Sequence, residues 1–175
     1  MKFGEDKRMQ YVIDTSILVE ISKNYYPEVF PSFWDYINEL IDNETIVSLV
    51  EVQKEIDKGK FSKQWDLINV NSSKKFFKEL EGDEMLGLSE ITELDIYTEK
   101  FKNKNDKITT LEEEWSIYGE EVADPLLICY GLYHDSTVVT LENPNNGHNI
   151  PHVCYLLGVR CIGLKEFLIE NEFNF

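Results

Sequence analysis

The chain has 175 residues, of which 42% are hydrophobic and 29% charged, with a net charge of −16. That length suits one domain with one sizeable core, and the balance is globular rather than disordered. No apolar run approaches the ~20 residues that span a bilayer, and the opening MKFGEDKRMQ has no apolar signal region. Three cysteines without a CxxC pair suit a reducing compartment. We therefore expect a cytoplasmic protein with no membrane partner.

The negative charge argues against a protein that holds nucleic acid by its surface field alone, because such proteins are basic. However, 11 of the 17 Lys and Arg residues lie between Lys54 and Lys107, so the positive charge is concentrated. A site built from carboxylates is also acidic by design and becomes competent only when cations fill it. The charge leaves room for a basic partner.

The first part of the chain predicts two strands, each followed by a helix. Residues 11–15 (YVIDT) predict a short buried strand, and a helix begins near Ser16. Residues 45–50 (TIVSLV) predict a second strand, followed by a helix that carries Glu51 and Glu55. We expect several amphipathic helices in the charged segment 58–121.

From residue 122 strands and helices alternate again. We expect, in order, a helix at 122–134, a strand at 136–142, a loop at 142–151, a helix at 152–158, a strand at 159–164 and a helix at 165–170. This alternation predicts an α/β fold with a parallel sheet covered on both faces. We expect a single domain over 1–175, with residues 58–121 as a mainly helical charged insertion and 100–107 as an exposed turn.

Four acids from distant segments are predicted to meet at one edge of this sheet. Ligands of open parallel sheets bind at the carboxyl ends of the strands. Asp14 ends the first strand, Glu55 follows the second, Asp124 begins a helix, and Glu142 ends the strand VVTLE. Clustered carboxylates raise one another's pKa, and a hard divalent cation such as Mg²⁺ or Mn²⁺ resolves the conflict. The chemistry that follows is phosphodiester hydrolysis.

Each acid also has a purely structural interpretation. Asp14 and Asp124 could each cap a helix. Glu51 is a rival to Glu55 one turn away, and Glu142 could be a turn acid. The hypothesis therefore depends on their joint placement.

At these residues the chain resembles the PIN-domain nuclease family. The matching segments are YVIDTS (11–16), VQKEID (52–57), ADPLLICYG (123–131) and VVTLE (138–142). NYYPEVFPSFWDYI (24–37), together with the tail from VVTLENPN onward, is similar to a PIN-like subfamily described as of unknown function.

The resemblance implies a PIN-like three-layer α/β/α sandwich with a mostly parallel central sheet of four or five strands. It implies that Asp14, Glu55, Asp124 and Glu142 bind the metal and carry out catalysis, with Ser16 and Thr140 as supporting hydroxyls. It also implies Mg²⁺ or Mn²⁺ as the cofactor and RNA as the substrate. Many members are toxins restrained by a small antitoxin, and many dimerise. The chain departs from the family at Glu142, where many members have Asp, which changes the reach to the metal by one methylene.

Other sites are less well supported by the sequence. All six Cys and His residues lie between 129 and 161, but their spacing fits no common zinc site. No GxGxxG or GxxxxGK[ST] motif occurs. Tyr25 and Tyr26 could stack on a base, although core or loop packing explains them better.

The leading prediction is a metal-dependent endoribonuclease, with a toxin-antitoxin role as its narrower form. The alternative is a catalytically weak or inactive PIN-like scaffold that binds a protein partner. The acidity, Glu142 and the long insertion motivate that alternative.

Overall fold

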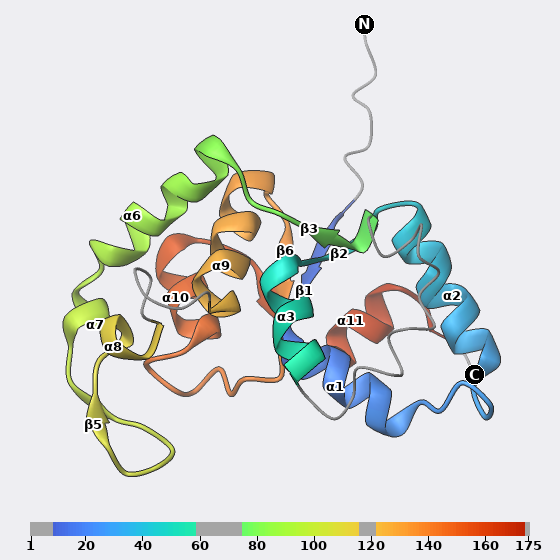
Figure 1. The fold of residues 1–175 in the computed structure, drawn as a ribbon, viewed down its shortest axis with the longest axis horizontal. Coiled ribbons are helices and arrows are strands. Elements are labelled where there is room, and N and C mark those ends of the chain that lie inside the picture. The colour runs from blue at the N-terminus through green and yellow to red at the C-terminus, as the bar shows by residue number, and fades with distance from the viewer. Residues whose placement is uncertain (1–8, 59–74, 116–121, 174–175) are drawn as a thin grey trace, which may run out of the picture.

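A five-stranded parallel sheet forms the centre of the computed structural model, which describes residues 9–58, 75–115 and 122–173 (Figure 1). The strand order is β3-β2-β1-β6-β7, and all four neighbouring pairs are parallel. The strands are β1 (Tyr11–Ile13), β2 (Ile46–Leu49), β3 (Phe77–Lys78), β6 (Thr137–Val139) and β7 (Cys161–Ile162). The central strand β1 pairs Val12 with Val47 on one side and Val138 on the other.

Helices and one small hairpin complete the described chain. The hairpin strands are β4 (Phe101–Lys102) and β5 (Ile108–Thr109), and they pair antiparallel. The helices are α1 (Thr15–Asn24), α2 (Pro31–Asp42), α3 (Val50–Lys58), the 3₁₀ helix η1 (Gly82–Leu86), α6 (Gly87–Thr92), α7 (Asp95–Thr98), α8 (Leu111–Trp115), α9 (Ala123–His134), α10 (Ile150–Leu157) and α11 (Leu164–Glu170).

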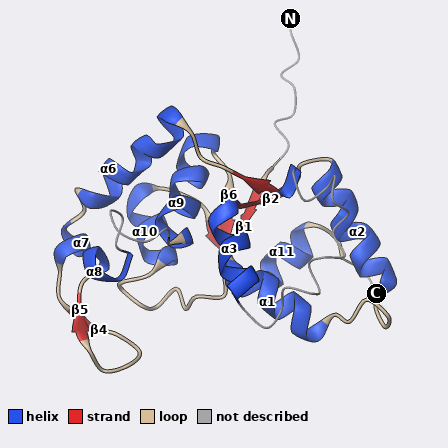
Figure 2. Ribbon diagram, in the orientation of Figure 1, coloured by secondary structure: helices blue, strands red, loops and turns tan. Residues whose placement is uncertain are grey.

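Helices cover both faces of the sheet. In Figures 1 and 2, α6, α9 and α10 lie on one side of the strands, and α1, α2 and α11 lie on the other. The prediction of an α/β fold with three layers and a parallel sheet of four or five strands is confirmed. None of the described helices is long and apolar enough to cross a membrane.

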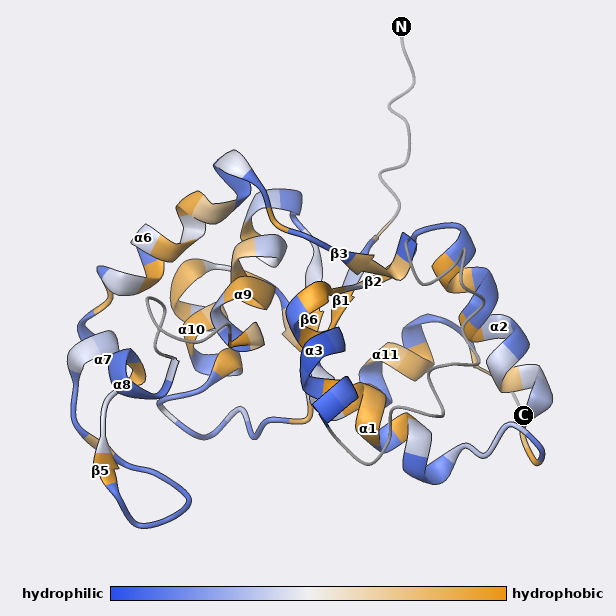
Figure 3. Ribbon diagram, viewed as in Figure 1, coloured by the Kyte–Doolittle hydropathy of each residue, from blue (hydrophilic) through white to orange (hydrophobic). Residues whose placement is uncertain are grey.

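The strands are short and buried, as expected when helices cover both faces of a parallel sheet. Every residue of β1, β2 and β6 is buried. Figure 3 shows these strands and much of α9 as hydrophobic, whereas the loop between β6 and α10 is hydrophilic. The core therefore ends where the strands end, and polar side chains begin at that edge.

Helix α9 packs directly across the sheet, against β1, β2 and β6. It is apolar around most of its circumference because α6, α10 and η1 cover the face that the sheet does not. Gly131 permits the close approach. A Cβ atom there would lie 2.8 Å from Val159 Cγ1 and 3.0 Å from Val138 Cγ2.

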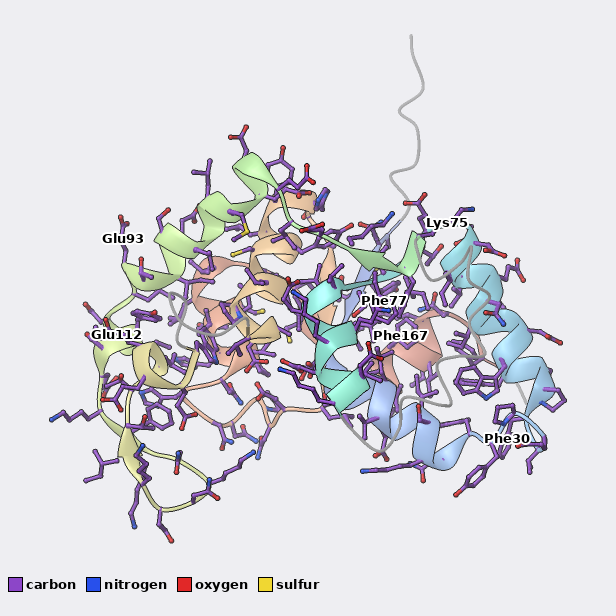
Figure 4. All side chains as sticks on the ribbon, in the orientation of Figure 1. Phe30, Lys75, Phe77, Glu93, Glu112 and Phe167 are labelled. Atoms are coloured by element: carbon purple, nitrogen blue, oxygen red, sulfur yellow. The ribbon has the colours of Figure 1, made fainter. Side chains whose placement is uncertain are left out.

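Helix α11 closes the opposite face beside β1. Phe167, which Figure 4 labels on α11, is 1% exposed. Its ring meets that of Tyr11 edge-on, with centroids 5.2 Å apart. The Tyr11 hydroxyl donates to Glu170 over 2.9 Å, and Arg160 pairs with the same carboxylate. The C-terminal helix is thus fixed to the first strand of the chain.

The segment 58–121 differs from its prediction in part. The expected exposed turn at 100–107 forms the tip of the β4–β5 hairpin, where Lys102 and residues 104–107 are exposed and Asn103 is partly buried. The strands β3, β4 and β5 were not predicted, because each has two residues and lies among charged and polar residues that hide any strand pattern. The expectation for 59–74 and 116–121 lies outside the described residues.

Candidate functional site

Asp14 follows the last residue of β1 and occupies the N-cap position of α1. Its side chain makes no capping bond to that helix, so capping does not explain it. Instead Asp14 Oδ2 accepts hydrogen bonds from Ser16 Oγ over 2.5 Å and from Thr140 Oγ1 over 2.8 Å. The residue is only 5% exposed, and both hydroxyls hold its carboxylate in one orientation.

The chain beyond β6 is attached to the same two hydroxyls. The backbone N–H of Leu141 donates to Ser16 Oγ over 3.0 Å, and that of Glu142 donates to Thr140 Oγ1 over 3.2 Å. Each hydroxyl therefore accepts one bond from this loop while it donates one to Asp14. Strands β1 and β6 are neighbours, so adjacent strand ends explain this convergence.

Glu55 joins three segments at the same edge. Its Oε2 accepts from Thr15 Oγ1 over 2.5 Å, and its Oε1 accepts from the backbone N–H of Ala123 over 3.2 Å. Thr15 is the neighbour of Asp14, and Ala123 is the first residue of α9. The first amides of a helix lack partners within it, so Glu55 satisfies one of them from another helix.

Asp124 lies in the first turn of α9 but is not its cap, since the N-cap is Val122. Burial, followed by the charges of Asp14, Glu142 and Glu55, raises the pKa of Asp124 from 3.8 to about 8, while a hydrogen bond with Trp115 opposes the rise. At neutral pH and without a cation, Asp124 is therefore mostly protonated. The four predicted acids lie close enough to act on one another electrostatically.

Glu142 is partly buried and its backbone lies three residues beyond the end of β6. Burial raises the pKa of Glu142 and the charge of Asp14 adds to the rise; the Ile150 N–H, at 2.8 Å from Oε2, and the charge of Lys104 oppose it. Lys104 belongs to the β4–β5 hairpin, which packs onto this loop through a stack of Phe101 on His148, with ring centroids 4.2 Å apart.

Glu51, the rival to Glu55, lies apart from this group. It is 8% exposed and its Oε1 is 3.8 Å from Lys54 Nζ. Its Oε2 has no hydrogen-bond partner among the described residues. Glu51 is not among the charges that act on Asp124, so the contacts favour Glu55 as the fourth member.

No preformed cation cage is present. Within residues 9–58, 75–115 and 122–173, no group of three or more His, Cys, Asp or Glu side chains is arranged to hold a metal ion. The acids instead direct oxygens toward hydroxyl and N–H donors. Asp14 Oδ2 already accepts two hydrogen bonds, whereas Glu55 Oε1, Glu55 Oε2 and Glu142 Oε2 each accept one from the described residues and keep a second lone pair that a cation could use. The same finding gives no support to a zinc site in the described chain.

Three neighbours of the acids were not predicted from the sequence. Thr15 had a signal, since it stands between Asp14 and Ser16, but its hydroxyl serves Glu55. Trp115 and Lys104 had none, because contacts between separate elements of the fold leave no trace in local spacing.

A family model described as a domain of unknown function (DUF4411) matches residues 11–175. The chain belongs to this family. The DUF4411 match includes all four acids and extends through the segment 58–121, where the sequence motifs gave no resemblance. No curated protein matches the sequence.

This protein is similar to a chain in a solved structure, the crystal structure of VapBC2 from Rickettsia felis bound to a DNA fragment from their promoter. The likeness covers 89% of this DUF4411 chain and 98% of the other, at 15% identity and a TM-score of 0.46. A likeness at that level supports no conclusion about activity.

Proposed function

We propose that this protein is a PIN-type, metal-dependent endoribonuclease. Asp14, Glu55, Asp124 and Glu142 are the proposed metal-binding and catalytic residues, with Mg²⁺ or Mn²⁺ as the cofactor. The observation that carries the proposal is the placement of the partly buried Asp124 among three other carboxylates, which come from the end of β1, from α3 and from the loop after β6.

The donor set fits a hard divalent cation. Carboxylate oxygens are the ligands that Mg²⁺ and Mn²⁺ select. Burial first, and then the negative charges of Asp14, Glu142 and Glu55, raise the pKa of Asp124, and a cation at the site would offset those negative charges. A bound ion would supply Lewis-acid stabilisation of the phosphate and a more acidic water.

The chain's own residues prepare the site. Ser16 and Thr140 fix the Asp14 carboxylate, and such outer contacts typically change metal affinity 10–100-fold. A cation held there would favour the ionised form of Asp124. The resemblance implies products with a 5′-phosphate and a 3′-hydroxyl.

The test is cleavage of single-stranded RNA by the purified protein. We expect cleavage with Mg²⁺ or Mn²⁺ and none with EDTA. Asp14→Asn and Asp124→Asn should abolish cleavage with unchanged circular dichroism. Asp35→Asn, an exposed aspartate of α2, is the matched control and should retain full activity. Equal cleavage by Asp124→Asn and the wild type would refute the assignment.

One observation favours a second candidate, a scaffold that binds a partner without cleaving. The described residues hold no preformed metal group, and the chain carries a net charge of −16. If the folded protein binds no Mn²⁺ at millimolar concentration, this scaffold is the better account.

A small antitoxin is the partner we propose for the nuclease, and a homodimer is the proposed assembly. A short neighbouring reading frame that encodes a DNA-binding protein would support the first. Light scattering of the purified chain would decide the second.

A further inference from the structure

A cavity of about 960 Å³ opens beside Glu142, one of the four acids. Thr140 and Glu142 form part of its wall, so it begins where the acid group ends. The rest of the wall comes mainly from β7, α11 and the loop before α10, and includes the apolar side chains of Leu141, Ile162 and Leu164. Its volume is at the upper end of the range for small-molecule sites.

The charged side chains in the cavity wall do not indicate a charged ligand. One basic side chain, Lys165, lines it together with two acidic ones, Glu142 and Glu166. A phosphate group would find no net positive charge there. An uncharged, flat and largely apolar group matches the lining better.

Aromatic rings are fixed at one end of the cavity. Tyr25 and Phe173 belong to the lining. Tyr25 stacks on Phe33 with ring centroids 4.4 Å apart, and Phe173 lies 5.2 Å from the same ring. Rings held in this way supply apolar contact at little entropic cost, as in proteins that stack the bases of single strands.

Apolar side chains are also left in water at the cavity. Leu141 is 44% exposed and Ile169 is 65% exposed, and both line it. Because the surface is acidic overall, the affinity that most nucleic-acid binders draw from phosphates is not available at its usual level. Burial of these apolar side chains against a base would supply affinity in place of the phosphate contacts.

We propose that this cavity binds a base of single-stranded RNA adjacent to the phosphate at the acid group. The inference rests on the proposed nuclease function and names how that nuclease holds its substrate. The shared wall, Thr140 and Glu142, puts the proposed base site next to the acid group. Substrate affinity then comes mainly from the base and only weakly from phosphates.

The cysteines provide a direct readout. Cys161 lines the cavity and is partly exposed, whereas Cys129 and Cys154 are 0% exposed. Alkylation of the native protein by N-ethylmaleimide therefore reports on Cys161. The rate is measured in EDTA with a mixed-sequence oligoribonucleotide of ten residues, so no cleavage is needed. We expect the RNA to slow alkylation at least about fivefold at saturation.

Two isoleucines of equal exposure give a matched pair of variants. Ile169 in the cavity is 65% exposed, and Ile108 on β5 is 67% exposed and outside it. Ile169→Asn should raise the RNA concentration for half protection by roughly fivefold or more, as expected from lost apolar burial. Ile108→Asn should leave that concentration within about twofold. Equal effects of the two variants would overturn the proposal.

If Cys161 does not react with N-ethylmaleimide, the salt dependence of RNA binding provides a second test. Fluorescence anisotropy measures that dependence. Each phosphate contact with a single strand contributes about −0.7 to the slope of log K against log salt. We expect a slope no steeper than about −1.5, which corresponds to roughly two contacts. A steeper slope with an unchanged Ile169→Asn affinity would contradict base binding.

The outcomes separate the two proposals. RNA protection without cleavage would retain the base site and remove the nuclease. Cleavage without protection, together with unaltered binding by Ile169→Asn, would retain the nuclease and remove the base site.

Discussion

The substitution Asp124→Asn should stabilise the metal-free protein at neutral pH while it removes the proposed metal site. Asn has the shape of Asp and carries no charge. In the folded wild type the pKa of Asp124 is raised to about 8, first by burial and then by Asp14, Glu142 and Glu55. Above pH 4 the unfolded carboxyl ionises freely and the folded one does not, so wild-type stability from this group falls as pH rises toward 8.

The magnitude follows from the two pKa values. Between 3.8 and pH 7 lie about three pH units, each worth about 1.4 kcal/mol. The ionisable group therefore costs the folded state up to about 4 kcal/mol at pH 7, and this is an upper value because the four acids titrate together. We expect Asp124→Asn to raise the free energy of unfolding by about 1–4 kcal/mol at pH 7 and by nearly zero at pH 4.

Urea unfolding followed by circular dichroism, in EDTA, measures both values. Asp35→Asn on the surface of α2 is the control and should change stability by less than about 0.5 kcal/mol at either pH. Excess Mn²⁺ should stabilise the wild type and leave Asp124→Asn unchanged. A variant no more stable than the wild type at pH 7, or equally stabilised at both pH values, would refute the electrostatic reasoning.

Two further substitutions test parts of the structure. Thr140→Val keeps the volume of a side chain that is 2% exposed but removes its hydrogen bond to Asp14. This variant should bind Mn²⁺ about 10–100-fold more weakly in calorimetry. An unaltered affinity would contradict an orienting role for the Thr140 hydroxyl. Gly131→Ala places a methyl group 2.8 Å from Val159 Cγ1 and should lower the free energy of unfolding by about 1–3 kcal/mol; an unchanged urea midpoint would mean that α9 approaches the sheet less closely.

Much of the sheet could be predicted from local sequence because its strands are apolar and its turns are marked. Residues 11–15 and 45–50 contain β1 and β2, and Gly158 ends α10 in a left-handed conformation with φ of 72°. The strand expected at 136–142 ends earlier, at Val139. The Thr140 N–H still donates to Ile162 O of β7 over 3.1 Å, but the N–H groups of Leu141 and Glu142 donate to the hydroxyls of Ser16 and Thr140, so the chain leaves the sheet after Thr140.

The acids themselves could be predicted for the same topological reason. Parallel strands end at one edge, so Asp14 and Glu142 were expected to meet, and the first turn of α9 was expected to bring Asp124 to them. Side-chain contacts between loops could not be predicted, since nothing in the spacing links Trp115 to Asp124. The cavity was equally inaccessible, because its wall comes from elements that meet only in the folded chain.

The central claim is that carboxylates from four segments form one divalent-cation site. Isothermal titration of the metal-free protein with Mn²⁺ tests it most directly, with Asp14→Asn, Glu55→Gln and Glu51→Gln measured beside the wild type. We predict saturable binding by the wild type and by Glu51→Gln, and none at millimolar Mn²⁺ by the other two. A folded wild type that binds no Mn²⁺, or an unchanged affinity in Asp14→Asn, would contradict the claim.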